Sequence, residues 1–126
     1  MKRASYIIIG VIMLLSASCG RQHDAESAVK DFMEANLTEG SHLSEVSLQR
    51  IDSTRHVNDS IVKAIRQTAQ QAPQPYKAKV NYIDNANGQT LITCRTHYKV
   101  NGKAYSGVFY LDNALTGVVA FIFHEE

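Results

Sequence analysis

Apolar residues recur at helical spacing in two segments of the chain. In residues 25–38 and again in residues 57–72 they return every three or four positions, so each segment has one apolar stripe, as an amphipathic helix does. Asp24 stands where the first helix would have its N-cap, and Gly40 follows its end. Pro73 ends the second, because a proline pushes the preceding residue out of the helical region. The pattern therefore predicts two helices.

Other segments alternate between apolar and polar residues with the two-residue period of a β-strand. The alternation is imperfect in residues 43–51 and regular in residues 76–82, which we expect to form a half-buried strand. Turn residues, Asp84 to Gly88, follow the second segment. The predicted strands are residues 43–51, 76–82, 91–100, 103–111 and 118–123.

Asn101-Gly102, between the third and fourth predicted strands, is a strong signal for a two-residue hairpin turn, and such a turn fixes the register. Opposed residues point to the same side of the sheet, so the pairing sorts side chains into an apolar face and a second, mixed face. The apolar face would pair Tyr98 with Tyr105, Thr96 with Gly107, Cys94 with Phe109, and Ile92 with Leu111. The second face would pair Lys99 with Ala104, His97 with Ser106, Arg95 with Val108, and Thr93 with Tyr110.

Length and charge limit the classes of function. The chain has 126 residues, enough for one domain, and a formal net charge of +1. So balanced a charge argues against nucleic-acid binding, which depends on a basic excess that neutralises phosphates. The 44% of hydrophobic residues excludes a compositionally disordered chain.

The first residues have the layout of a secretory signal. Lys2 and Arg3 precede an apolar run over residues 7–15, and the small residues Ser16, Ala17 and Ser18 follow. Nine helical residues would span about 14 Å, under half of the roughly 30 Å bilayer core. We therefore expect residues 1–18 to be a signal peptide rather than a permanent transmembrane helix.

The segment Leu14-Leu15-Ser16-Ala17-Ser18-Cys19 resembles the lipobox of bacterial lipoproteins, although Ser16 stands where that family usually has Leu. The resemblance implies cleavage before Cys19 and lipidation of that cysteine. Residues 19–23 would then be a lipidated tether and residues 24–126 a single domain. Gly20, rather than Asp, after the cysteine implies the outer membrane of a bacterial cell envelope. Without residues 1–18 the formal charge is −1, and no basic cluster adds to membrane attachment.

Cys94 is the second cysteine. It could form a disulfide with an unlipidated Cys19, pair between chains, or be a small buried side chain in its strand. The position of Cys94 on the apolar face favours burial.

The predicted order is helix, strand, helix and a four-stranded antiparallel meander, which is an α+β fold with a curved sheet packed on helices. This order resembles the cystatin-like and nuclear-transport-factor-2-like folds. The mature chain also resembles small envelope lipoproteins of mostly uncharacterised function. The matching residues are Ala28-Val29, Phe32, Asn36-Leu37, Val46-Ser47, Ile51-Asp52, His97-Tyr98 and Phe109-Tyr110-Leu111-Asp112.

Few residues point to catalysis. The five histidines lack metal-ligand spacing, and no nucleophile elbow or phosphate loop occurs, so we expect no metal and no cofactor. Two groups of side chains remain as candidate sites. Tyr98, Tyr105, Phe109 and Tyr82 could line a small pocket or simply form the core. Arg95, His97 and Tyr110 could form a surface for a protein partner or a homodimer, or a solvated sheet face.

These observations favour a lipid-anchored, non-enzymatic binding or interaction module. One alternative is a pocketed enzyme of the isomerase or dehydratase type, which requires a carboxylate or histidine pointing under the sheet. The inward positions of the hairpin hold neither. Another alternative, from fold analogy alone, is an inhibitor of an envelope enzyme that inserts a loop such as Asn101-Gly102.

Overall fold

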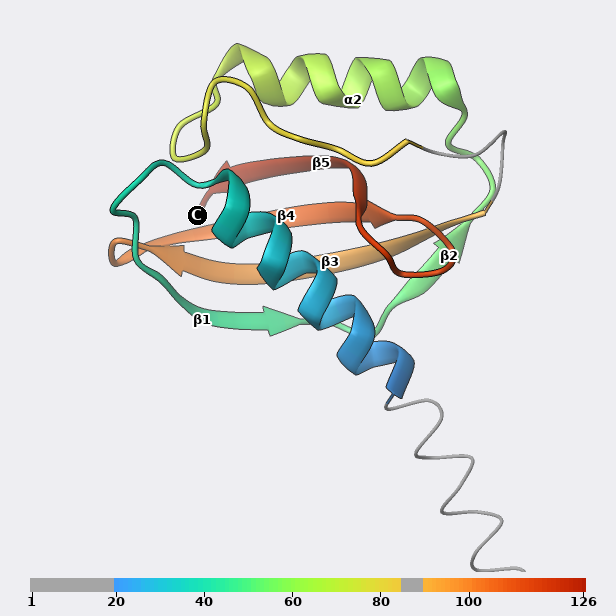
Figure 1. Cartoon of the computed structure of the whole chain (residues 1–126), viewed down its shortest axis with the longest axis horizontal. Helices are drawn as coiled ribbons and strands as arrows, with labels where there is room; N and C mark the ends of the chain where they lie inside the picture. The colour runs from blue at the N-terminus through green and yellow to red at the C-terminus, as the bar shows by residue number, and fades with distance from the viewer. Residues whose placement is uncertain (1–19, 85–89) are drawn as a thin grey trace, which may run out of the picture.

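The protein has an α+β fold in which helices pack against one curved antiparallel sheet (Figure 1). The computed structural model describes residues 20–84 and 90–126, so the signal segment, Cys19 and most of the predicted turn after Asp84 lie outside the described residues. A helix covers residues 20–36. It is followed by β1 (Leu43–Leu48), β2 (Asp52–Thr54), α2 (Asp59–Gln71), β3 (Leu91–Val100), β4 (Lys103–Leu111) and β5 (Val118–Glu125).

The sheet has five strands in the order β1-β3-β4-β5, and β2 also pairs with β3. Only β3, β4 and β5 are consecutive neighbours, so the predicted four-stranded meander is wrong. On its other side, β3 pairs with two strands that precede α2 in the chain. The strand β1 pairs with the end of β3, and β2 pairs with its beginning. One predicted strand over residues 43–51 is thus two short strands.

The hairpin of β3 and β4 has the predicted register. Tyr98 opposes Tyr105, Cys94 opposes Phe109, and Val100 opposes Lys103 across the Asn101-Gly102 turn. Both turn residues have a positive φ, as this turn type requires. The residues predicted for the apolar face are all buried. The division of side chains between the two faces is therefore confirmed.

Residues 76–82 do not form a strand, contrary to the prediction. Tyr76 makes only an isolated bridge with Leu37. The backbone N–H groups of Lys77 and Asn81 donate instead to the carbonyl and side-chain oxygens of Asn36, at 2.8 and 2.9 Å. Hydrogen bonds to Asn36, at the end of the N-terminal helix, keep this segment extended. An alternating sequence pattern does not distinguish such a segment from a paired strand.

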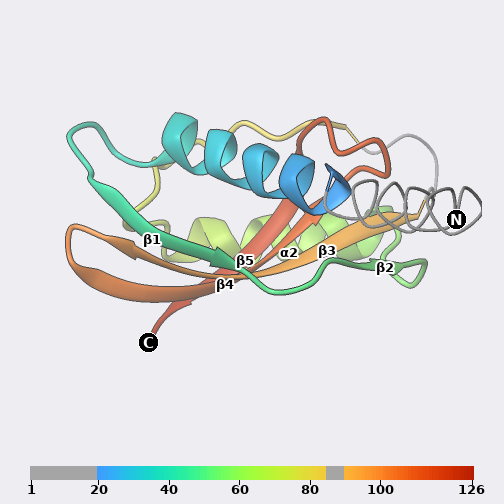
Figure 2. The same ribbon diagram turned by 90° about the horizontal axis from the view of Figure 1, so that it is seen from below.

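The N-terminal helix lies across the apolar face of the sheet (Figure 2). Its buried apolar side chains are Ala25, Val29, Phe32 and Met33, which match the predicted stripe, and Asn36 in its last turn is buried as well. Residues 20–24 are already helical, so Asp24 is not the N-cap and the predicted tether is helical from residue 20 onward.

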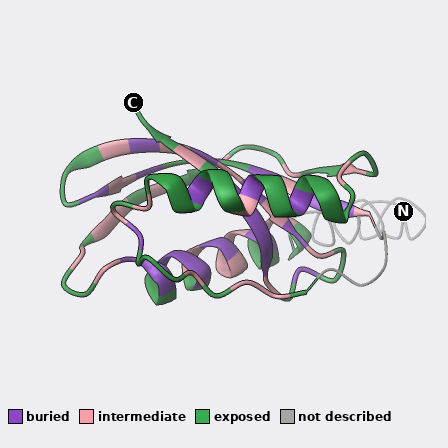
Figure 3. Cartoon of the chain, turned by 90° about the horizontal axis from the view of Figure 1, so that it is seen from above, coloured by how far each residue is buried: buried purple, intermediate pink, exposed green. Residues whose placement is uncertain are grey.

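The second helix, α2, runs along the β5 edge of the sheet (Figures 1 and 3). Its N-cap is Asn58, whose side chain accepts from the Ile61 N–H at 2.9 Å, and it ends just before Pro73 as predicted. The second helix does not pack only under the apolar face: it adds Ala69 to the core there, and Val62 and Ile65 to a second cluster. That cluster also contains Leu91, Val119 and Ala120.

Both outer edges of the sheet are modified. In β1 the register shifts between Ser44 and Ser47, and Glu45 there has a φ of 52° and an ion pair with Lys99 at 2.7 Å. At the start of β5, the carbonyl of Val118 accepts from the Ile83 N–H at 3.0 Å. The next carbonyl, that of Val119, accepts from Arg66 Nε at 2.8 Å. These features interrupt the row of edge backbone groups within β1 and at the start of β5.

Candidate functional site

The aromatic residues predicted as a pocket or core pack against one another on the apolar face. Phe109 is fully buried, and the rings of Tyr98 and Tyr105 are stacked with centroids 5.7 Å apart. Phe32 of the N-terminal helix contacts Phe109 edge-on at 6.0 Å and Tyr82 at 5.9 Å. These side chains fill the space between sheet and helix, as a core does.

A buried pair of hydroxyls lies within this core. Tyr76 Oη donates to Tyr98 Oη at 2.8 Å, and the two side chains are 1% and 2% exposed. Burial raises the pKa of each tyrosine well above its usual value, so both hydroxyls stay protonated at neutral pH. The alternating pattern placed Tyr76 in a predicted strand, but it did not indicate that the Tyr76 hydroxyl would bond to that of Tyr98.

Cys94 lies on the apolar face, fully buried, as expected. Burial raises the pKa of its thiol to about 12. At neutral pH the thiol is protonated, and a protonated thiol is a poor nucleophile and a poor metal ligand. In the folded chain Cys94 is a small apolar side chain.

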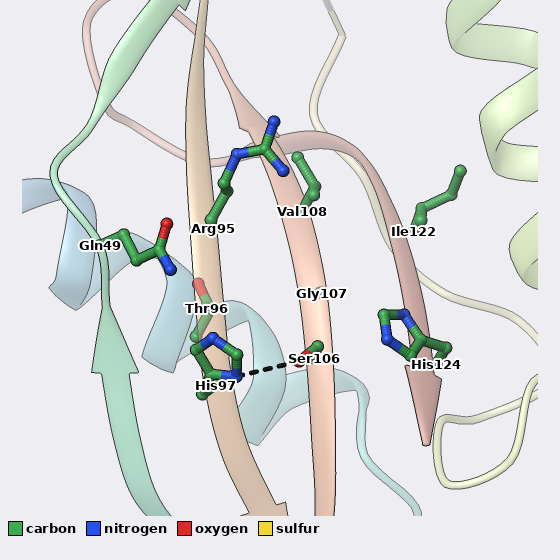
Figure 4. Close-up of a pocket in the computed structure, with 9 residues that line it drawn as sticks. All are labelled: Gln49, Arg95, Thr96, His97, Ser106, Gly107, Val108, Ile122 and His124. Carbon is green, nitrogen blue, oxygen red and sulfur yellow. Dashed lines mark hydrogen bonds between the residues drawn. The ribbon is translucent and has the colours of Figure 1, made fainter. Parts of the chain in front are cut away.

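The second face carries a hollow of about 280 Å³ (Figure 4). Arg95 and His97 of the predicted interaction surface are among its lining residues. Tyr110 is not, because it packs against the cluster formed with α2. The lining residues are Gln49, Arg95, Thr96, His97, Ser106, Gly107, Val108, Ile122 and His124.

The hollow follows from the sizes of side chains in two cross-strand rows. Val108 lies between Arg95 and Ile122 in one row, and Ser106 lies between His97 and His124 in the next. The middle strand, β4, carries short side chains while its neighbours carry long ones, so the centre is lower than the sides. The sequence predicted the β3–β4 half of these rows, but it gave no register for β5 and so missed Ile122 and His124.

At one end of the hollow three side chains form a polar cluster. His97 Nδ1 lies 2.6 Å from Glu126 Oε1 and 2.9 Å from Ser106 Oγ, and Ser106 also donates to the same carboxylate oxygen. Hydrogen bonds from Ser106 and then from His97 hold the pKa of the Glu126 carboxyl below its usual value. An ionised carboxylate only accepts, so the proton facing it belongs to Nδ1.

This cluster lacks the geometry of a catalytic triad. In a triad the acid and the hydroxyl bind opposite nitrogens of the imidazole, so that a proton can pass through the ring. Here Ser106 and Glu126 both meet Nδ1 of His97. The cluster joins β3 and β4 to Glu126, the residue that follows β5.

Arg95 stands at the other end of the hollow and is exposed. None of the four ion pairs found among residues 20–84 and 90–126 includes it. In the same cross-strand row, with Val108 between them, Ile122 of β5 is 38% exposed, one of two large apolar side chains so exposed in the described chain. A planar cation next to exposed apolar surface is well suited to bind a carboxylate attached to an apolar group.

Arg66 is a further polar residue whose role the sequence did not indicate. It lies on α2, donates to the carbonyls of Val119 and Ile83 at 2.8 and 3.1 Å, and places its guanidinium 4.6 Å from the centre of the Tyr82 ring. Arg66 thereby joins α2, β5 and the segment that includes residues 80–84. Its contacts are structural.

Neither a metal-binding cluster nor a membrane-spanning helix occurs among the described residues. No group of three or more His, Cys, Asp or Glu side chains there could hold a metal ion. The helices of residues 20–84 and 90–126 include none with the length and apolar character needed to cross a bilayer.

Comparison of the chain with protein-family models, with curated proteins and with solved structures gives no match.

Proposed function

We propose that this chain is a lipid-anchored protein of the bacterial cell envelope that acts as a non-enzymatic binding module of the cystatin-like kind. The lipobox-like segment ending in Cys19 supports the anchor. The binding role depends on one observation, the hollow on the second face with Arg95 at its end. The apolar face is filled by the core, so the second face is the side on which a partner could dock.

The hollow suggests what a protein partner would present. Val108 and Ile122 offer apolar surface and Arg95 offers a cation without an ion-pair partner among the described residues. Apolar surface rimmed by polar groups is typical of interaction sites, and arginine is frequent among residues that dominate binding energy. The partner would place an apolar side chain over Ile122 and a carboxylate against Arg95.

Two features favour binding over catalysis. The inward positions of β3 and β4 carry neither a carboxylate nor a histidine. The histidine of the second face has its serine and its acid on the same nitrogen. An acid–base enzyme needs a titratable group aimed at its substrate, and neither arrangement supplies one.

The anchor is tested by replacing Cys19 with Ser in the full chain. We expect loss of acyl labelling and loss of stable attachment to bacterial membranes, while the matched Cys94→Ser variant keeps both. Several acyl chains on one cysteine give a firm attachment, because each buried methylene contributes about 0.8 kcal/mol. Unchanged labelling in Cys19→Ser would contradict the anchor.

The binding face is tested by photo-crosslinking in intact envelopes. A crosslinking amino acid at Ile122 should give a discrete adduct, whereas one at the exposed Gln70 of α2 should not. Arg95→Gln should reduce the adduct several-fold, and the matched Arg55→Gln should leave it unchanged. An adduct of two copies of this chain would identify a homodimer, and equal crosslinking from both positions would refute the binding face.

A further inference from the structure

The first turn of the N-terminal helix is fastened to the body of the domain. Gln22 Nε2 donates to the carbonyl of Gln49 at 3.0 Å, and Gln22 Oε1 accepts from the Ile51 N–H at 3.0 Å. Arg21 Nη2 donates to the carbonyl of Asn113 at 3.3 Å. One turn of helix is thus held by the connection between β1 and β2 and by the loop between β4 and β5.

This fastening leaves almost no chain between the proposed lipid site and the domain. Cys19 directly precedes Gly20, which is already helical. Consecutive Cα atoms across a trans peptide are about 3.8 Å apart, so the lipidated residue lies within about 4 Å of a fixed element. A flexible linker of ten residues would instead allow an r.m.s. reach of about 17 Å.

We infer that the domain lies directly against the lipid headgroups, with one particular end facing them. That end comprises the start of the N-terminal helix, β2 and the loop of residues 112–117, while the Asn101-Gly102 turn points away from the membrane. Acyl chains attached next to Gly20 bring this end to the headgroup level, since no linker separates them. The inference rests on the proposed lipidation of Cys19.

The two ends are well separated in the structure. In both views the start of the helix, β2 and the β4–β5 loop lie at one end, and the β3–β4 turn lies at the other (Figures 1 and 2). The helix spans residues 20–36, which corresponds to a length of about 25 Å. At its far end, the Asn101 N–H donates to the His42 carbonyl at 2.9 Å.

Charge contributes little to this orientation. The exposed charged residues at the membrane-facing end are of both signs, namely Arg21, Asp24, Arg50, Asp52 and Arg55. Anionic lipids attract clusters of basic residues, and this mixture is not one. The orientation should therefore depend on the covalent attachment and vary little with salt.

The same orientation places the hollow of the second face at mid-height. Arg95 is the fifth residue of β3, and β3 begins next to β2 at the membrane-facing end. Four steps of about 3.3 Å put it roughly 13 Å along the strand. A partner could then reach Arg95 and Ile122 from the side, without displacing the domain from the headgroups.

Fluorescence quenching in vesicles tests the orientation. The chain has no tryptophan, so Asn113→Trp and Lys103→Trp each give a single reporter at opposite ends. Both positions are exposed. The purified lipidated variants would be placed in vesicles of phosphatidylethanolamine and phosphatidylglycerol containing a lipid with a nitroxide on its headgroup. We expect quenching at Asn113→Trp to exceed that at Lys103→Trp several-fold, at low and at high salt.

A linker variant supplies the matched control. About ten Gly and Ser residues inserted between Cys19 and Gly20 keep the lipidation site and a glycine after it, but let the domain turn. The several-fold difference between the two reporters should then shrink toward equality. Circular dichroism and denaturant unfolding would show that each variant keeps its fold.

The outcomes separate the orientation from the anchor. If the chain carries no acyl label and does not bind the vesicles, the proposed anchor fails. If it is lipidated and bound but both reporters are quenched equally without the inserted linker, the anchor stands and the inferred orientation is wrong. Stronger quenching at Lys103→Trp would also overturn it, since the opposite end would face the lipid.

Discussion

The two faces of the β3–β4 hairpin are built from alternate residues of the same strands, yet they differ in almost every physical property. Cys94, Tyr98 and Phe109 are at most 2% exposed, whereas Arg95 and His97, next to them in the chain, are exposed. The N-terminal helix covers the first set, and no described helix covers the centre of the second (Figure 2). Stability thus depends mainly on the first face, while the second stays exposed.

Thiol labelling shows the largest expected difference between the faces. The pKa of Cys94 is raised from 9.0 to about 12, so at pH 8 the folded protein has roughly a thousandfold less thiolate at this position. In a chain beginning at Gly20, Cys94 should react with a thiol reagent only after unfolding. A cysteine introduced on the second face by Val108→Cys should react in the folded state. Rapid reaction of Cys94 in the folded chain would contradict its burial.

Truncating one side chain on each face compares how much the two faces contribute to stability. Phe109→Ala removes a fully buried ring that contacts Phe32 and Phe121, and should lower the free energy of unfolding by about 3–5 kcal/mol. Ile122→Ala on the second face should lower it by less than about 1 kcal/mol. Urea unfolding measures both changes. Equal losses would mean that the second face is as much a part of the core as the first.

Loss of the hydrogen bond between Tyr76 and Tyr98 should have a smaller effect on the free energy of unfolding. Tyr98→Phe leaves the buried Tyr76 hydroxyl without its partner, at a cost of about 1–3 kcal/mol in the free energy of unfolding. Because both groups belong to one hydrogen bond, the double variant Tyr76→Phe, Tyr98→Phe should cost less than the sum of the single variants. Strictly additive costs would show that the bond does not contribute to stability.

The exposed cluster on the second face should have the smallest effect. The pKa of Glu126 is lower in the folded state than its usual 4.5. Its contribution to stability is therefore present above about pH 4.5 and is lost as the pH falls through the folded-state pKa. Glu126→Gln should remove this part of the acid dependence of unfolding, measured between pH 6 and pH 3, and lower stability at pH 7 by the same small contribution. An identical acid dependence in the variant would refute the interaction.

Local sequence rules predicted the parts of the fold that depend on neighbours in the chain. The Asn101-Gly102 turn fixed the register of nine residue pairs, because a two-residue loop permits only one alignment. Pro73 marked the end of α2, because a proline disfavours the helical conformation of the residue before it. The start of the N-terminal helix was missed, since Asp24 fits an N-cap by type, while hydrogen bonds from Arg21 and Gln22 to distant residues hold the preceding turn.

The unpredicted parts depend on contacts between distant residues. The segment after Pro75 has the alternation of a strand, but Asn36, remote in sequence, takes the hydrogen bonds that a neighbouring strand would have taken. The β4–β5 connection is longer than a tight turn and is held by Asp112, whose carboxylate accepts from Thr116 and Gly117. No sequence rule gives the register across such a loop, so the sequence did not indicate that Ile122 and His124 line the hollow.

The altered edges of the sheet also bear on how the chain behaves at high protein concentration. The register of β1 shifts around Glu45, whose φ is positive, and hydrogen bonds from Ile83 and Arg66 occupy the first carbonyls of β5. Strand-to-strand polymerisation needs a straight row of vacant donors and acceptors at an edge. Along these stretches the edges offer no such row, which disfavours the addition of a strand from a second copy there.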